Sequence, residues 1–373
     1  MMNKKVVTLI IAVVVIITVI VSILIIIKND HTENTLADLS INEIKNMYNE
    51  LELKLIPMTD NGKIDFEAME IKDHQHIAYC LKAEANLKEK PEVVRELTKY
   101  LVDHSDDNMD GEIGWGLGYP YDAFSDGTIN PEWHPYTIEV ANVIDAYIDA
   151  LHSGCLSQEL SDSVKNQLHD IVLLWNQKYW SESNSSGDKS FYWYSISKDD
   201  AISCTNIDAK MIGTQAKLLD QYSELFTEEE KIIIFNHIDS GYTKLMQKSY
   251  MSEGNLTWNY FESPKSSQND AIHHGFILEG IYDYQKYRIK EPPLSDKNYT
   301  SYIDKCIKDN IIYSTPKYSS HRCFNTDTIR WVSDREVQKE ILIKSYDLYV
   351  NSDTVKRQLA FLLNAFSMYL SES

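Results

Sequence analysis

The stretch "TIEVANVIDAYIDAL", residues 137–151, has apolar side chains three or four positions apart. They are Ala141, Ile144, Ile148 and Leu151. This spacing predicts an α-helix with one apolar stripe. Segments 206–222 ("NIDAKMIGTQAKLLDQY") and 268–287 ("QNDAIHHGFILEGIYDYQKY") carry the same kind of stripe. Because these stripes include alanine and glycine, we expect the three helices to pack closely against their neighbours.

More polar helices are predicted between these segments, over 158–175 and 227–247. The second begins with Thr227 and Glu230 in the spacing of a capping box. The ends of the three small-residue helices recur at intervals of roughly 63 to 71 residues, which suits one helical hairpin plus a long loop. No stretch alternates convincingly between apolar and polar residues, so we expect an all-α repeat of hairpins.

The loops ahead of the small-residue helices also resemble one another. They are "GWGLGYPYDAF" (114–124), "FYWYSIS" (191–197) and "LTWNYFESP" (256–264), and each places a Trp before a Tyr. Each loop then continues through a polar run into a helix start. Loops of this length are uncommon without a function, so we expect the three to meet at one end of the molecule.

The hairpin period, these loops and the helix start "D-x-x-H-H-G-x-x-L-x-G" (270–280) together resemble the (α/α)-toroid carbohydrate-active proteins. That group includes glucuronyl C5-epimerases, several polysaccharide lyases and some exopolysaccharide-biosynthesis proteins. The resemblance covers about residues 74–370. It implies a toroid of five or six helical hairpins, an (α/α)5–6 fold, whose inner helices begin at the rim of a central cleft.

The resemblance implies that residues from the three helix entrances line this cleft and bind a polysaccharide or oligosaccharide. The catalytic candidates are His134, Tyr136, Tyr260, Asp270, His273 and His274. The substrate-binding candidates are Trp115, Tyr119, Tyr121, Trp193, Tyr194, Asn206, Asp208, Trp258 and Asn259. Aromatic faces can stack on sugar rings, while Asn, Asp and His can hold hydroxyl groups.

Three functions stay open at this point, with uronyl epimerase or lyase chemistry as the leading expectation. Uronyl epimerase or lyase chemistry would use a Tyr or His base, although cations to neutralise a uronate are scarce, with His321 and Arg322 the nearest group. Glycoside hydrolysis would use two carboxylates. The candidates for that pair are Asp122, Asp126, Glu132, Asp208 and Asp270. A non-catalytic glycan-binding protein in a polysaccharide synthesis or export complex is the third.

A metal held by His273 and His274 is not expected, because adjacent residues on a helix point about 100° apart and zinc helices use i and i+4. We expect one of the two to face the cleft and the other to cap or pack. Asp106, Asn108 and Asp110 match the first half of a calcium-binding loop, although position twelve is Leu117 rather than Glu. They are a weak calcium candidate, and no other cofactor is expected.

The run from Val6 to Ile27 is apolar apart from two threonines and a serine, and it is long enough to cross a bilayer. Lys4 and Lys5 precede it, so the positive-inside rule places the short N-terminus in the cytoplasm. We therefore expect a cytoplasmic stub (1–5), a transmembrane signal anchor (6–27), a linker (28–40) and an extracytoplasmic toroid domain (41–373). The formal charge of −20 argues against binding to nucleic acid.

Overall fold

The computed structural model describes residues 39–372, apart from 184–186, 188, 262–267, 296–297, 309–328, 333 and 351–355. From Lys45 onward the chain forms one compact unit, and the following account concerns that unit. No helix among the described residues is long and apolar enough to cross a membrane. The predicted signal anchor, residues 6–27, lies outside the described residues and stays a prediction.

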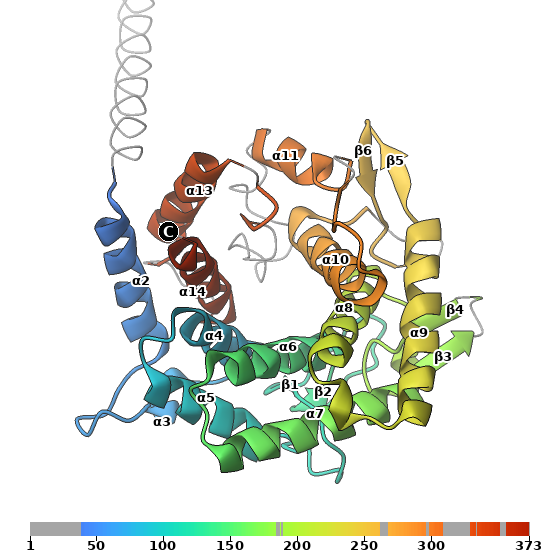
Figure 1. The fold of residues 1–373 in the computed structure, drawn as a ribbon, viewed down its shortest axis with the longest axis horizontal. Helices are drawn as coiled ribbons and strands as arrows, with labels where there is room; N and C mark the ends of the chain where they lie inside the picture. The colour runs from blue at the N-terminus through green and yellow to red at the C-terminus, as the bar shows by residue number, and fades with distance from the viewer. Residues whose placement is uncertain are drawn as a thin grey trace, which may run out of the picture. The chain divides into compact units, whose positions relative to one another are not determined.

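The unit is built on a ring of inner helices that pack side by side (Figure 1). They are α4 (His74–Leu87), α6 (Thr137–Ser153), α8 (Thr205–Gln221), α10 (Ala271–Asp283) and α14 (Lys356–Ser371). Helix α4 packs on α6, α6 on α8, and α8 on α10. The last inner helix, α14, packs against the first, α4. Three of these helices contain the three sequence segments with small-residue stripes.

The other long helices lie outside this ring, and most pack on the inner helix that precedes them in sequence. They are α2 (Ile41–Leu55), α5 (Pro91–Asp103), α7 (Gln158–Lys178), α9 (Glu228–Gln247), α11 (Ser301–Lys308) and α13 (Arg335–Tyr349). Thr227 and Glu230 form the predicted capping box at the start of α9. The expected alternation of inner and outer helices is therefore confirmed. The chain has an (α/α)-toroid fold.

Short hairpins occupy the loops that precede α6, α8 and α10, where the sequence predicted no strands. The antiparallel pairs are β1 (Gly116–Leu117) with β2 (His134–Pro135), β3 (Trp180–Ser183) with β4 (Lys189–Tyr192), and β5 (Tyr250–Ser252) with β6 (Asn255–Thr257). The remaining short elements are α3 (Phe66–Met69), the 3-10 turns η1 (Lys198–Asp200) and η2 (Ser223–Leu225), and the π-helical turn η3 (Tyr284–Ile289). Strands this short leave too few residues for a period-two pattern to be visible.

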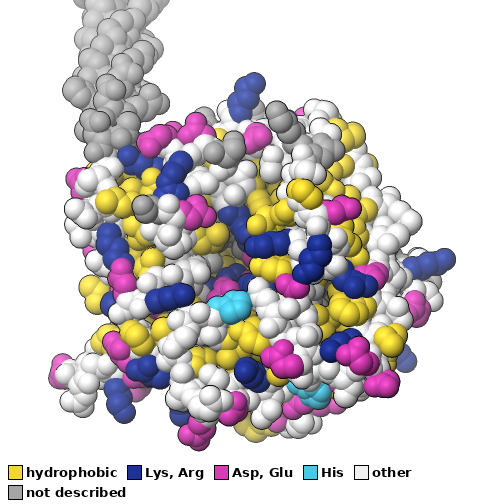
Figure 2. Space-filling model, viewed as in Figure 1, with side chains coloured by type: hydrophobic (Ala, Val, Ile, Leu, Met, Phe, Trp, Pro, Cys, Tyr) yellow, Lys and Arg dark blue, Asp and Glu magenta, His cyan; other side chains and the backbone are white. Residues whose placement is uncertain are grey.

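A layer of buried charges fills the ring between its two ends. Lys82 on α4 lies 2.6 Å from Asp145 on α6, and Lys210 on α8 lies 3.0 Å from Asp145 and 2.6 Å from Glu279 on α10. Lys82 also lies 3.7 Å from Glu279. Side chains of α4 and α10 therefore meet across the ring. Figure 2 shows lysine and arginine side chains gathered in the hollow at the middle of the face in view.

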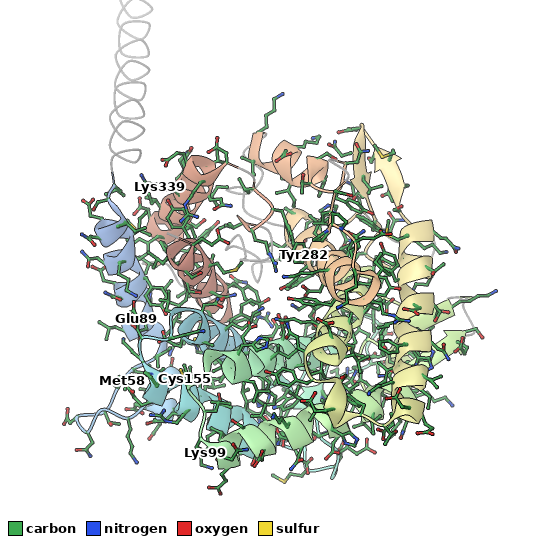
Figure 3. All side chains as sticks on the ribbon, viewed as in Figure 1. Met58, Glu89, Lys99, Cys155, Tyr282 and Lys339 are labelled. Atoms are coloured by element: carbon green, nitrogen blue, oxygen red, sulfur yellow. The ribbon has the colours of Figure 1, made fainter. Side chains whose placement is uncertain are left out.

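This charged layer gives the inner helices a common register. Lys82, Asp145 and Glu279 each lie nine residues after the N-cap of their own helix, about two and a half turns. The inner helices are consequently parallel, and their first turns share one end of the ring. At the level of the charged layer, Arg330 lies 3.4 Å from Glu279 and over the ring of Tyr282, which Figure 3 labels on α10.

Glycines set the close approach of α8 and α10, as the sequence predicted for Gly280. A Cβ atom at Gly280 would collide with the backbone carbonyl of Ala209 on α8. One at Gly213 would lie 2.5 Å from the carbonyl oxygen of Gly280. The two backbones are thus in direct contact, and any side chain at these positions would push the helices apart.

Candidate active site

Two aspartates cap inner helices that face each other across the ring. Asp73 is the N-cap of α4 and accepts the backbone N–H of His76 at 2.8 Å. Asp270 is the N-cap of α10 and accepts the backbone N–H of His273 at 2.9 Å. Because α4 and α10 meet through Lys82 and Glu279 deeper in the ring, their capped ends lie on opposite sides of the same mouth.

Asp73 belongs to a buried cluster with Glu139 and Arg357. Glu139, in the first turn of α6, accepts the backbone N–H of Gln75 at 2.9 Å. Nη1 of Arg357, at the start of α14, lies 3.7 Å from Oε1 of Glu139. Nε of the same guanidinium lies 4.0 Å from Oδ2 of Asp73. One cation thus faces two carboxyl groups contributed by α4 and α6.

The surroundings of Glu139 favour its protonated form. Burial, and next the negative charge of Asp73, raise the pKa of the Glu139 carboxyl well above its usual range. Arg357 and the N–H of Gln75 oppose this shift without cancelling it. Two acids that share one cation in a buried place do not both ionise readily. The cluster therefore favours a protonated Glu139 beside Asp73.

The Asp270 carboxylate has a different environment. Its side chain is 43% exposed, so solvent can reach it. Its second oxygen lies 2.9 Å from Nδ1 of His273, and the His273 ring packs against Tyr260 with centroids 4.8 Å apart. The backbone bond and the imidazole together hold this carboxylate at the mouth of the ring. It is an accessible carboxylate with a fixed orientation.

An aromatic surface lies beside the carboxyl pair. Tyr119 and Tyr121 are 37% and 38% exposed, and their ring centroids are 6.4 Å apart. Tyr121 contacts Tyr136 at 6.2 Å, and Tyr136 contacts Tyr194 at 5.9 Å. Both exposed tyrosines lie close to Arg357. Burial lowers the pKa of its guanidinium, but Asp73 and Glu139, and then these two tyrosines, raise that pKa overall. The predicted candidates Tyr119, Tyr121, Tyr136 and Tyr194 are therefore brought together at the rim.

The tyrosines of this surface are poor bases. Burial is the main cause that raises the pKa of Tyr136, Tyr194 and Tyr260 above the usual tyrosine range. Tyr260 is also hydrogen-bonded to Cys204 and Tyr194, within a cluster that packs on the start of α8. These phenols stay protonated at neutral pH, so they can donate hydrogen bonds but do not readily take a proton.

His134 is held in a hydrogen-bonded chain. Its Nε2 lies 2.9 Å from Oγ of Ser195, which donates in turn to Asp200 at 2.6 Å. Asn130 links Asp200 to the hydroxyl of Tyr136, with bonds of 2.7 and 3.1 Å. Burial lowers the pKa of His134, so the neutral ring is favoured. Ser195 is fully engaged by these bonds, and the chain fixes the entrance to α6.

The structure places Trp115 and Trp258 in the interior, although both were expected to line a cleft. Both indoles are fully buried and donate their N–H to backbone carbonyls, of Leu101 and Leu245 respectively. Each fills the space between its hairpin and the helices beneath it. The repeated Trp of the Trp–Tyr loops therefore packs the loop at these two positions and has no surface to offer a ligand.

Three more candidates are also buried. Asn206 accepts the thiol of Cys204 at 3.0 Å. Asp208 points outward to α9, where Nζ of Lys244 lies 2.9 Å from its carboxylate. His274 is 0% exposed and lies 3.3 Å from the carbonyl of Tyr299. Burial lowers the pKa of His274 to about 4. Of the adjacent histidines, it is His273 that lies with Asp270 at the mouth.

Two other candidates lie outside the rim. Asn259 is exposed and accepts the hydroxyl of Tyr250 at 2.7 Å, next to the β5–β6 hairpin. Trp193 is half-buried at the end of β4, and its indole N–H donates to Ser181. Neither belongs to the cluster around Asp73 or to the one around Asp270.

The loop that contains the calcium candidates is held by hydrogen bonds between its own residues. Oδ1 of Asp106 accepts the backbone N–H groups of Asp110 and Gly111, and Asn108 donates to Asp110. The same backbone pattern recurs from Asp122 to Thr128. Within the described residues, no three acidic, His or Cys side chains gather as a metal site would require. Oδ1 of Asn108 is buried without a hydrogen-bond partner, and the weak calcium candidate stays a prediction.

The sequence prediction missed Asp73, Glu139 and Arg357. One signal was available, because Asp73–His76 and Asp270–His273 share the pattern D-x-x-H at a helix start. The first of these lacks a preceding Trp–Tyr loop, which hid its equivalence. Glu139 lies inside an apolar helix, where an acid marks either a buried partner or a site. Arg357 has no local signal, because its partners are more than two hundred residues away in sequence.

Comparison with known proteins bears on the fold alone. No protein-family model and no curated protein matches the chain. Among solved structures, a reducing-end xylose-releasing exo-oligoxylanase is similar, with a TM-score of 0.51 and 10% identity over 90% of this chain and 92% of that chain. A β-1,3-1,4-glucanase from Paenibacillus sp. X4 is similar with a TM-score of 0.53 and 9% identity, over 90% and 94% of the two chains. A mutant exo-oligoxylanase complexed with xylobiose gives a TM-score of 0.50 at 11% identity, over 90% and 94%. The chain shares the toroid fold of these proteins.

Proposed function

We propose that this protein is a glycoside hydrolase that acts on a polysaccharide or oligosaccharide at the mouth of the toroid. The carboxyl pair of Asp73 and Glu139 is the acid side of the reaction, and Asp270 is the base side. The proposal rests on one observation: Asp73 and Asp270 cap facing inner helices of one ring. Hydrolysis of a glycosidic bond needs two carboxyl groups that flank the bond in this way.

The two sides differ as acid and base should. The buried pair keeps a proton because of the raised pKa of Glu139, and this proton goes to the glycosidic oxygen as the bond breaks. The exposed Asp270, held by His273, takes a proton from the water that attacks the anomeric carbon. In the inverting arrangement that this assignment implies, the two carboxyl groups stand about 6.5–9.5 Å apart so that this water fits between them. Tyr119 and Tyr121 offer aromatic surface to the sugar rings.

The similar solved structures support the same choice, because they are a xylose-releasing exo-oligoxylanase and a β-1,3-1,4-glucanase. Epimerase or lyase chemistry is less well supported. Tyr136 and Tyr260 have raised pKa values, which disfavours a phenolate base. Arg357 already faces two carboxyl groups, so it has little charge left to neutralise a uronate. The other expected cations, His321 and Arg322, lie outside the described residues.

The test is the release of reducing ends by the full chain in detergent, from xylan, mixed-linkage β-glucan and an acidic polysaccharide. We expect Asp270→Asn, Asp73→Asn and Glu139→Gln each to lower turnover by about a hundredfold or more. The matched control is Asp334→Asn, because Asp334 is an N-cap of the outer helix α13. An unsaturated ultraviolet-absorbing product, or solvent deuterium at C5, without new reducing ends would sink the hydrolase in favour of a lyase or an epimerase.

We also propose that residues 6–27 anchor the protein in a membrane, with the toroid outside the cytoplasm. The apolar run and the two lysines before it support this. Membrane fractionation of the full chain tests it, since an anchored protein resists extraction by carbonate and requires detergent. Recovery of the full-length chain in the carbonate supernatant would contradict the anchor. Association with a synthesis or export complex is the non-catalytic alternative, and it predicts glycan binding without turnover.

A further inference from the structure

A cavity lies outside the rim, between the end of α7, the hairpin that follows it and the loop around residue 110. Its volume is about 430 Å³, within the range of about 300–1,000 Å³ that is usual for small-molecule pockets.

 A separate cavity of about 760 Å³ lies between β4 and α9. The residues that line the smaller cavity are Asp110, Glu112, Lys178, Tyr179, Trp193, Ile196 and Lys198.

Trp193 lines the cavity with an indole ring whose N–H already donates a hydrogen bond within the protein. Its Nε1–H donates to Oγ of Ser181 at 2.7 Å, which fixes the ring. The ring of Tyr179 lies beside it, with centroids 5.7 Å apart and an angle of 64° between the planes. Tyr179 is only 3% exposed and supports the indole from the interior, so Trp193 offers a ligand aromatic surface in a fixed orientation, which suits the apolar face of a sugar ring.

The charged groups around these rings balance. Lys178 lies 2.6 Å from Glu112, and the hydroxyl of Tyr179 donates to the same carboxylate at 2.8 Å. Asp110 and Lys198 add one further charge of each sign. Two acids and two lysines give a cavity with no net charge, in a protein whose formal charge is −20. Such a lining favours a neutral ligand rich in hydroxyl groups over an anionic one.

The cavity is connected to the proposed active site through the backbone. The N–H of Trp193 donates to the carbonyl of Tyr179 at 2.9 Å, and its own carbonyl accepts the hydroxyl of Thr137. Thr137 is the first residue of α6, two positions before Glu139. We propose that this cavity is an accessory binding site for a neutral sugar unit, and that it holds a distal part of the polymer cleaved at the rim. The second half of this inference rests on the proposed function.

Affinity electrophoresis of the full chain in detergent, through gels containing mixed-linkage β-glucan or xylan, tests the site. We expect Trp193→Ala to weaken retardation by at least about fivefold and Trp193→Phe to restore most of it, because a ring is what the site needs. Trp180→Ala is the matched control on the same hairpin. The Trp180 ring stacks on His237 at 4.5 Å, and Trp180 does not line the cavity. Thermal unfolding of each variant checks that the fold is intact.

The outcomes separate this inference from the proposed function. Equal retardation of the parent and Trp193→Ala, or no retardation of the parent by either polymer, overturns the accessory site even if the protein hydrolyses glycans. Retardation that depends on Trp193, with no reducing ends released, leaves the site standing and removes the hydrolase. Equal loss of retardation in Trp180→Ala would assign the effect to the hairpin as a whole and would also overturn the site.

Discussion

The guanidinium of Arg357 lies 3.7 Å from the carboxyl group of Glu139, although 218 positions separate them in the sequence. The same guanidinium lies 4.0 Å from Asp73. The last inner helix thus supplies the cation that allows two acids from the first two inner helices to be buried together. The proposed chemistry at the rim and the closure of the ring therefore involve the same side chain.

Removing this cation should destabilise the fold. We expect Arg357→Met to lower the free energy of unfolding by about 3 kcal/mol at pH 8, because it leaves two buried acids without a counter-charge. Denaturant titration measures the loss, and Lys356→Met, at the neighbouring position, is the control. Adding Glu139→Gln should recover part of it, since one of the unpaired acids is gone. Strict additivity of the two substitutions would contradict the shared guanidinium.

The charged layer inside the ring should be equally sensitive. Lys210 is fully buried between Asp145 and Glu279, so Lys210→Met should cost about 3–5 kcal/mol. Lys290→Met is the matched control, because Lys290 pairs with Asp220 at the surface and should contribute less than about 1 kcal/mol. Similar losses in the two variants would mean that the layer is hydrated and does not fill the ring.

Stability should depend on pH through Glu84. Burial, and next the charge of Glu52, raise the pKa of Glu84 to about 7, and Tyr48 donates to its carboxyl at 2.5 Å. The native state therefore binds a proton that the unfolded chain has lost above about pH 4.5. This contribution to stability is present below pH 4.5 and is lost as the pH rises through 7. Urea titrations from pH 5 to 8 should show a decline that Glu84→Gln flattens; an unchanged slope would contradict the assignment.

The glycine contact between α8 and α10 gives a graded prediction. Gly280→Ala should cost about 3 kcal/mol or more, because the added Cβ meets the rigid backbone of Ala209. Gly241→Ala should be nearly neutral, since its Cβ meets the flexible end of the Ile212 side chain, lies 3.4 Å from the Trp180 ring, and alanine favours a helix. Thermal unfolding compares the two, and an equal loss would show that contact with the backbone of Ala209 does not set the cost at Gly280.

The helical repeat could be predicted because its signal is local. An apolar stripe and a capping box depend on residues within a few turns, and the helices that begin at Thr137, Thr205 and Ala271 appear where their stripes predicted. The repeated tryptophans were misinterpreted for the opposite reason. Whether an indole packs inward or faces solvent is set by neighbours distant in sequence, and Leu101 and Leu245 accept the two indole N–H groups.

The candidate site was only half predictable. Asp270 and His273 are adjacent on one helix start, so their pairing could be anticipated from sequence. Asp73, Glu139 and Arg357 come from three different inner helices, and only closure of the ring brings them together. A single sequence contains no measure of such long-range proximity.

The contact between α14 and α4 has a consequence for how the chain reaches its folded state. Asn86 on α4 donates to Asn364 on α14, a bond that closes a loop of 278 residues. Contacts of such high order form slowly, because the entropy of closing the loop is lost before the contact forms. During synthesis, the side of α4 that packs on α14 therefore stays uncovered until the last helix has been made. Over that interval the apolar surface of α4 can aggregate, so we expect a chaperone to bind this surface for longer than it binds the other inner helices.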